Sequence, residues 1–502
     1  MYNTLKFKSS AEYVGGKTQM GEQGVLIKKE NWIWRVDAVL IGYMFAVQMV
    51  ITASGEWNGI FHVLYGICVV AEMIFIFSRI FYAKSCNTAE KILVVYIVWF
   101  TVSRLICGDT SLSESSEYII LSTFCICLFD YGAALNAEQR RRVLTIFSIG
   151  LCVFYFVIGI AGIYAALTRS MVKLPLDISV GIKAEGELRY LTIFGRHRNT
   201  TAQWFCLCAC LAAYLFGVYK SRVFHITLAT VIAVCYVMVA LSLSRTTMIT
   251  LSVALAMTVV IYIDRKLFGK GNRARALAAV LAVVLIVPLS YKGYGVVGDI
   301  AENLGAKIVL VNENVGNHSM GTIADIYGEN TQELKDNDVL FSETRDAGNV
   351  KKLGGRGLVW KSAISLLFME PERLLHGSLD NEYMTMVNVF ISATDPAAIV
   401  VNTHNFFLET LMLTGLPGLL LILAFIFILV CRMLRIFFDT GVDSSIKLLT
   451  LPLTTVLLKN MGEAMLLRYD DITNYMFFLV AGVFLAYSYE LLPEKKLHLR
   501  KT

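Results

Sequence analysis

Long runs of hydrophobic residues alternate with short polar segments along most of the chain. A helix of about 17 to 25 apolar residues crosses about 30 Å of hydrocarbon, and about twelve runs have this length. We predict membrane-spanning helices at residues 36–53, 60–81, 90–107, 116–134, 143–167, 200–218, 223–241, 246–263, 276–291, 405–431, 446–459 and 471–490. The pattern predicts an all-α polytopic membrane protein with about 12 transmembrane helices.

Composition supports this fold class. Of the 502 residues, 56% are hydrophobic and 17% are charged, which excludes a water-soluble globular protein. The net charge of +6 is modest and does not indicate nucleic-acid binding. The eleven cysteines fall almost entirely in apolar runs, so no disulfide framework is expected.

The positions of lysine and arginine predict the orientation. Every second connection between the predicted spans is basic, as at Arg79/Lys84, Arg140–Arg142, Lys220/Arg222, Arg265–Arg275 and Arg432/Arg435. Short basic connections remain in the cytoplasm. The N-terminal tail, residues 1–35, and the C-terminal tail, residues 491–502, are therefore predicted to be cytoplasmic.

This orientation leaves one large segment outside the membrane. Residues 36–291 would hold the first nine spans, residues 292–404 a large extracytoplasmic loop, and residues 405–490 the last three spans. Long loops in compact proteins are usually functional. Within this loop, residues 358–375 form an amphipathic pattern that predicts a helix.

Four short motifs lie at the predicted outer membrane surface, three beside spans and one in the large loop. They are GRHRN (195–199), LSRTT (243–247), GGRGLVW (354–360) and THNFFLE (403–409). Guanidinium groups bind phosphate in a planar, bidentate manner, so several arginines at one membrane boundary suit a lipid-linked diphosphate. The candidates are Arg196, Arg198, Arg245 and Arg356. The competing interpretation is that these side chains contact ordinary lipid phosphates.

His404 is the candidate catalytic residue. Imidazole titrates near neutral pH and can remove the proton of an acceptor hydroxyl, although a lone histidine is more often structural. We find no zinc motif, P-loop, dinucleotide fingerprint or nucleophile elbow, so neither a metal nor another cofactor is expected.

Together with MEPERLL (369–375) and LTGLPGLLL (413–421), these motifs resemble the O-antigen ligase and polymerase family of bacterial membrane glycosyltransferases. The resemblance covers residues 190–435 in detail. It implies a GT-C-like fold with one large extracytoplasmic loop. The segment His376-Gly377-Ser378 departs from the Gly-x-Gly turn that is common in the family.

The resemblance also implies a reaction. The family transfers glycan from undecaprenyl diphosphate to an acceptor hydroxyl at the outer face of the bacterial cytoplasmic membrane, with inversion and without metal. By resemblance, His404 is the base, and Arg196 or Arg198, Arg245 and Arg356 bind the diphosphate. The implied partners are the lipid-linked glycan donor, a glycan or lipid-linked acceptor, the bilayer, and a chain-length regulator or flippase.

Three functions remain open. A polysaccharide polymerase is placed first, because polymerisation serves O-antigen, capsule and exopolysaccharide alike. An O-antigen ligase would transfer the glycan to lipid A core instead. A lipid-linked glycan transporter or flippase would be expected to show internal repeats and buried charge along several spans, whereas here Glu72 is the clearest interior charge.

Overall fold

The structure is a computed structural model. It describes residues 87–109, 115–174, 178–185, 188–193, 197–266, 272–314, 356–392, 403–439, 441–463, 466–467 and 471–492, with scattered positions between 42 and 77. The spans predicted at 36–53 and 60–81, both predicted tails and residues 315–355 lie outside the described residues.

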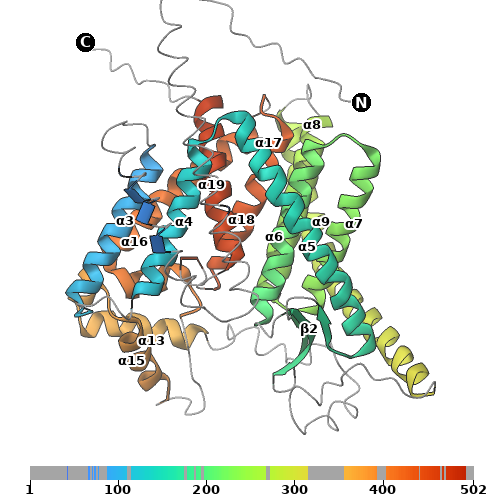
Figure 1. Ribbon diagram of the computed structural model, residues 1–502, viewed down its shortest axis with the longest axis horizontal. Coiled ribbons are helices and arrows are strands. Elements are labelled where there is room, and N and C mark those ends of the chain that lie inside the picture. Colours follow the sequence, from blue (N-terminus) through green and yellow to red (C-terminus); the bar gives the residue numbers. More distant parts are fainter. Residues whose placement is uncertain are drawn as a thin grey trace, which may run out of the picture.

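The described residues are mostly helical (Figure 1). The helices that run along the bundle are α3 (Thr88–Ile106), α4 (Ser116–Ala134), α5 (Ala137–Thr168), α6 (Arg198–Val218), α7 (Arg222–Leu241), α8 (Arg245–Lys266), α9 (Asn272–Asn314), α16 (Phe406–Phe438), α18 (Thr450–Asn460) and α19 (Ile472–Leu491). Within the described ranges, seven helices are long and apolar enough to cross a membrane, namely α5 to α9, α16 and α19. A polytopic helical membrane protein is confirmed at this level.

Asparagine side chains begin two of these helices. Asn136 accepts from the backbone N–H of Gln139 at 3.0 Å, and the Gln139 side chain accepts from the Asn136 N–H at the same distance. Asn87 and Glu90 make the same reciprocal pair at the start of α3. These capping boxes satisfy N–H groups that have no partner within the helix.

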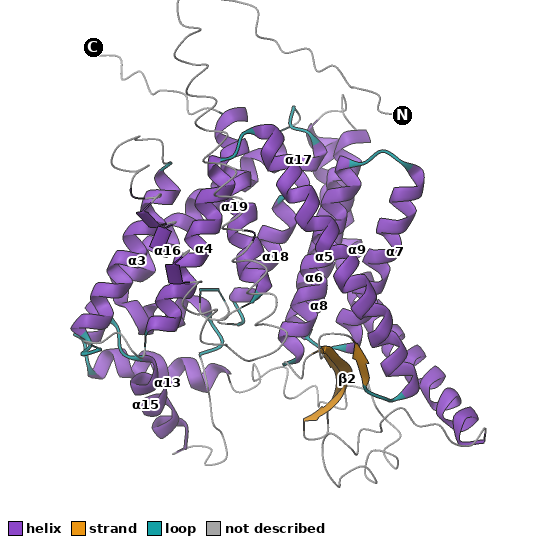
Figure 2. Ribbon diagram, viewed as in Figure 1, coloured by secondary structure: helices purple, strands orange, loops and turns teal. Residues whose placement is uncertain are grey.

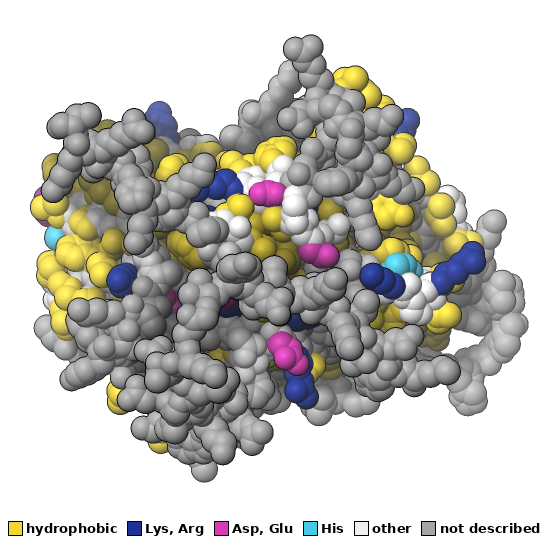
Figure 3. Space-filling model, turned by 90° about the horizontal axis from the view of Figure 1, so that it is seen from above, with side chains coloured by type: hydrophobic (Ala, Val, Ile, Leu, Met, Phe, Trp, Pro, Cys, Tyr) yellow, Lys and Arg dark blue, Asp and Glu magenta, His cyan; other side chains and the backbone are white. Residues whose placement is uncertain are grey.

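Burial sorts the helices into central and peripheral ones. In α19 every residue from Ile472 to Ala486 is buried, and in α6 the same holds from Thr201 to Leu215. A helix that is apolar on all sides must be surrounded by others. By contrast, α9 exposes most of its aliphatic side chains. Seen along the bundle, hydrophobic side chains occupy the sides of the molecule (Figure 3).

The all-α prediction needs one correction. Between α5 and α6 the chain forms β1 (Val172–Leu174), β2 (Ile178–Glu185) and β3 (Leu188–Ile193), an antiparallel sheet of order β1-β2-β3. Val180 pairs with Ile193 and Ile182 with Leu191, and all four are buried. Alternating β-branched residues favour strands, and this sheet covers the end of α5 (Figure 2).

Two predicted span boundaries also change. The span expected at 446–459 is divided at Leu449 into α17 (Ser444–Leu448) and α18, with Pro452 in the first turn of α18, where a missing N–H is tolerated. The span expected at 276–291 continues as α9 to Asn314.

A sharp kink divides α16. Gly415 has φ 66° and Pro417 follows it. Proline lacks an N–H and therefore frees a carbonyl of the preceding turn. Polar side chains of α3 take up the exposed carbonyls: Trp99 Nε1 donates to the Thr414 oxygen at 2.8 Å, and Ser103 Oγ to the Leu413 oxygen at 3.4 Å. The LTGLPG segment is thus a kink held by α3.

Three further helices cap this end of the bundle: α13 (Arg356–Met369), α14 (Arg373–His376) and α15 (Asp380–Ser392). They form a small apolar core of their own, in which Val359 and Ala363 of α13 pack with Tyr383 and Val387 of α15 and with Met412 of α16. In Figure 1, α13 lies crosswise to the long helices.

Candidate active site

The long helices alternate in direction, so the connections that hold the four motifs come to one end of the bundle. The sheet, α13 and α15 lie at this end (Figure 2). The helix α6 begins within GRHRN, α8 within LSRTT, α13 within GGRGLVW, and α16 within THNFFLE. Four segments that are distant in sequence therefore meet.

The residues around His404 hold its backbone in place. Asn405 caps α16, because its Oδ1 accepts from the N–H groups of Phe407 and Leu408 at 3.0 and 3.1 Å. Thr403 donates from its N–H and its hydroxyl to one oxygen of Glu409, at 2.9 and 2.6 Å. Trp360 Nε1 donates to the Thr403 carbonyl at 2.7 Å.

His404 itself has φ 51°, in the left-handed region that is uncommon for residues other than glycine. The contacts of its neighbours stabilise this conformation. Its side chain is 33% exposed, so a ligand can reach the ring.

Glu463 receives hydrogen bonds from three of the converging segments. Its Oε2 lies 3.2 Å from His404 Nδ1, and its Oε1 accepts from Arg356 Nη2 and from Asn199 Nδ2, both at 2.6 Å. Glu463 is 6% exposed. We call His404, Glu463, Arg356 and Asn199 the Glu463 cluster.

Glu463 is held in its charged form. Burial alone raises the pKa of its carboxyl, but the hydrogen bond from His404 and the charge of Arg356 outweigh burial and leave this pKa below its ordinary value. An ionised carboxylate is only an acceptor, so His404 Nδ1 must carry the proton of their hydrogen bond. In the neutral ring, the free lone pair is then on Nε2.

Asn199 connects the cluster to two more elements. Ser244, directly before α8, donates to Asn199 Oδ1 at 2.8 Å. Lys459, at the end of α18, is almost completely buried and donates to the Asn199 carbonyl. Arg356 also lies beside Gly462, with its Nη1 3.3 Å from where a Cβ on that glycine would be. The start of α6, the start of α8 and the loop before α19 therefore form one polar network.

Residues 228–423 match the sequence model of the O-antigen ligase family. This match supports the similarity of the chain to the O-antigen ligase and polymerase family. The matched region contains Arg245, Arg356 and His404, three of the residues predicted for the site. The resemblance inferred from the motifs is confirmed, and a glycosyltransferase-type enzyme is implied. The comparison with curated proteins gives no match.

The structure places the predicted site residues in different positions. His404 and Arg356 both contact Glu463. Arg245 begins α8 next to Ser244, which belongs to the same polar network. Arg198 lies with its guanidinium carbon 5.9 Å from the ring centroid of Tyr190 in β3. Arg196 lies outside the described residues.

Glu463, Asn199 and Lys459 were not predicted from the sequence. Asn199 is the last residue of GRHRN, in which only the arginines were predicted as site residues. Lys459 ends the predicted span 446–459, and Glu463 lies in the outer connection that follows, so a lysine at a span end followed by a carboxylate was the available signal. Neither residue is in the region matched by the family model.

Two aromatic residues also make structural contacts near His404. Trp360 binds the Thr403 carbonyl, and the hydroxyl of Tyr383 donates to Glu409. Both therefore support the loop that carries His404.

The departure at His376-Gly377-Ser378 also has a structural explanation. Gly377 has φ 77°, and a Cβ there would lie 2.4 Å from the backbone of Leu413. The Ser378 N–H donates to the Met412 carbonyl at 2.8 Å. Arg104 of α3 donates to the Ser378 carbonyl at 2.5 Å. The turn needs glycine at 377, and the backbone groups of the flanking residues bind α3 and α16.

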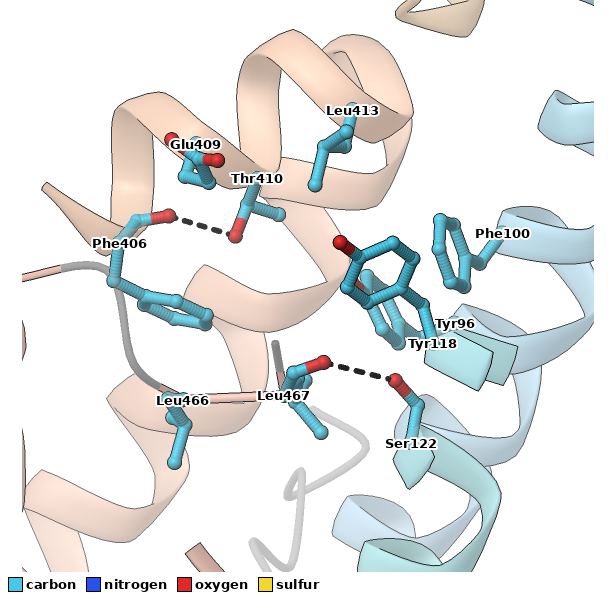
Figure 4. Close-up of a pocket in the computed structure, with 10 residues that line it drawn as sticks. All are labelled: Tyr96, Phe100, Tyr118, Ser122, Phe406, Glu409, Thr410, Leu413, Leu466 and Leu467. Carbon is cyan, nitrogen blue, oxygen red and sulfur yellow. Dashed lines mark hydrogen bonds between the residues drawn. The ribbon is translucent and has the colours of Figure 1, made fainter. Parts of the chain in front are cut away.

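A small pocket lies beside the first turns of α16, between α3, α4 and the turn at Leu466–Leu467 (Figure 4). Its walls are mainly aromatic and aliphatic, with Glu409 and Thr410 on one side and Ser122 on another. Such a lining suits an apolar group better than a sugar. In the described part of the chain, no group of three His, Cys, Asp or Glu side chains is placed to bind a metal.

Proposed function

We propose that this chain is a polysaccharide polymerase of the bacterial cytoplasmic membrane. It would transfer glycan from undecaprenyl diphosphate to an acceptor sugar hydroxyl on the outer face, with inversion and without metal, within a twelve-span GT-C-like fold. The observation that carries the proposal is that His404, Arg356 and Glu463 are in direct contact where the family motifs meet.

In this proposal His404 acts as a general base. The acceptor hydroxyl gives its proton to Nε2 while its oxygen attacks the anomeric carbon, and the bond from that carbon to the diphosphate oxygen breaks. Glu463, bound to Nδ1, fixes the tautomer and stabilises the imidazolium that forms. General-base catalysis of this kind contributes about 10²- to 10⁴-fold in rate.

The leaving diphosphate needs positive charge close to its oxygens. Arg356 uses one N–H in the hydrogen bond to Glu463, and a guanidinium has five N–H donors in all. The other N–H groups of Arg356 can bind phosphate. Arg245 at the start of α8 and Arg196 or Arg198 of the GRHRN motif can bind it as well. This arrangement provides the electrostatic stabilisation that a phosphate leaving group requires.

The test is the electrophoretic length distribution of surface glycan in cells that carry His404→Ala, compared with the unaltered protein and Arg245→Ala. His225→Ala is the matched control, because His225 binds the Tyr219 carbonyl between α6 and α7, at the other end of the bundle. Equal membrane levels of all variants are confirmed first.

If long chains vanish with His404→Ala and single repeat units remain, the polymerase proposal is supported. If full-length chains form but stay on the carrier lipid, the chain is an O-antigen ligase. Unchanged glycan with His404→Ala would contradict both and favour the transporter interpretation.

A further inference from the structure

The outer helices present large apolar side chains that no described element covers. Phe368 and Met369 at the end of α13 are 79% and 64% exposed, and Leu375 of α14 is 65% exposed. Ile364 lies one turn before Phe368 on the same face of α13. We call Ile364, Phe368, Met369 and Leu375 the apolar cap.

The apolar cap continues an exposed apolar stripe on α3. Val98, Val102 and Leu105 follow one another at helical spacing, and the stripe ends at Ile106. The end of α3 touches α14 directly: Ser103 Oγ donates to the His376 carbonyl at 2.5 Å, and Cys107 Sγ lies 3.3 Å from His376 Nδ1. Leu375 therefore lies beside the end of the stripe.

The apolar cap also continues a stripe on α16. Leu416, Leu420, Leu423 and Phe427 are exposed on one face of this candidate span. The kink brings this face to α14, since a Cβ on Gly415 would lie 2.6 Å from the Leu375 backbone. Two exposed stripes thus meet at Leu375.

These contacts identify what covers the cap. If α16 crosses the membrane, its exposed apolar face lies in the hydrocarbon region and is surrounded by acyl chains. Exposing a continuous apolar stripe of this kind to water would be unfavourable in free energy. The cap belongs to the same uninterrupted surface. We propose that the apolar cap inserts into the acyl-chain region of the adjacent leaflet, so that α13 and α14 form an interfacial membrane anchor.

This anchor would fix the depth of the Glu463 cluster. One end of α13 carries Phe368 in the cap, and the other end begins with Arg356, which binds Glu463. Because the helix is crosswise to the bundle, anchoring its far end would hold Arg356 near the headgroup level (Figure 1). This consequence rests on the proposed function, whereas the anchor itself does not.

Photocrosslinking tests the anchor in the full-length protein. Benzoylphenylalanine is placed at position 368 or 375, and the purified protein is reconstituted in vesicles of phosphatidylethanolamine and phosphatidylglycerol with labelled acyl chains. Position 420 on α16 is the lipid-facing reference. Position 385, an exposed residue of α15, is the matched control. All of these sites are on the surface, so folding is preserved.

We expect positions 368 and 375 to crosslink acyl chains to an extent similar to position 420 and at least about fivefold above position 385. Labelling of 368 and 375 at the level of 385 would overturn the proposal. A crosslink from 368 to a second copy of the chain would overturn it as well. Because the measurement does not depend on glycan transfer, its failure is distinguishable from failure of the proposed function.

Discussion

Within the segment Thr403-His404-Asn405, three neighbouring residues have different roles. Asn405 caps α16, and Thr403 is held by Glu409 and Trp360. Only the His404 side chain is directed to Glu463. The surrounding hydrogen bonds stabilise a backbone conformation that a histidine seldom adopts, which keeps the imidazole in one position.

At the residue scale, we predict that Glu463→Gln lowers glycan transfer at least about tenfold, because the ring of His404 loses the carboxylate that fixes its tautomer. Glu463→Asp should restore part of the rate. The control is Glu490→Gln, which breaks an ion pair with Arg140 at the other end of the bundle. Rates are measured with purified protein and lipid-linked donor. A Glu463→Gln enzyme as fast as the control would contradict this role.

Glu463 also predicts how stability depends on pH. Its pKa is lower in the folded protein than the unfolded value of about 4.3, so its contribution is complete above that value and is lost as pH falls through the folded-state pKa. The difference in thermal midpoint between the unaltered protein and Glu463→Gln should be constant from about pH 6 to 8 and shrink only below about pH 4. A difference that already falls between pH 8 and 6 would exclude Glu463 as its source.

At the level of elements, the contact between α14 and the kink of α16 organises this end of the bundle. Two glycines with positive φ, Gly377 and Gly415, allow the two backbones to approach closely. A Cβ on Gly377 would lie 2.4 Å from the Leu413 backbone, and a Cβ on Gly415 would lie 2.6 Å from the Leu375 backbone. Arg373 reinforces the turn through hydrogen bonds to Ser378 Oγ at 2.6 Å and Glu382 at 2.7 Å. The kink therefore positions α13 and α15 as well as α16.

We predict that Gly377→Ala lowers the thermal midpoint of the purified protein, with a loss of about 1–3 kcal/mol from strain and the close contact with Leu413. Gly150→Ala is the matched control, since nothing lies near its added Cβ and alanine favours the helix. Equal midpoints for the two variants would show that the α14 turn does not require glycine.

At the scale of the whole molecule, the alternating directions of the helices collect the motifs at one end. If the basic connections are cytoplasmic, Lys220 between α6 and α7 faces the cytoplasm, and Thr385 on α15 faces the outside. Both residues are exposed.

We therefore expect Thr385→Cys to react with a membrane-impermeant maleimide in intact cells, and Lys220→Cys to react only after permeabilisation. The unaltered chain has cysteines of its own, so its labelling is subtracted from that of each variant. Reaction of Lys220→Cys in intact cells would reverse the predicted orientation and, with it, the side of the membrane on which transfer takes place.

Hydrophobic periodicity alone located most of the described spans, because burial in lipid requires a long apolar run whatever the helix packs against. It also placed the motifs at helix ends. Hydrophobic periodicity did not predict the short sheet, the break before α18 or the extension of α9. Each of these features depends on the positions of a few polar or proline residues, which the average hydrophobicity of a segment does not reveal.

The sequence by itself determined the membrane class, the positions of the motifs and the similarity to the O-antigen ligase family, because these depend on local composition and on short motifs. Only the tertiary structure decided which side chains meet. The contact of Glu463 with His404, Arg356 and Asn199 joins residues 59, 107 and 264 positions apart. The contact of Arg198 with the ring of Tyr190 likewise depends on how β3 packs beside the start of α6. A one-dimensional pattern shows which residues are polar at a helix end, but the packing and direction of neighbouring helices determine which of them share a hydrogen bond.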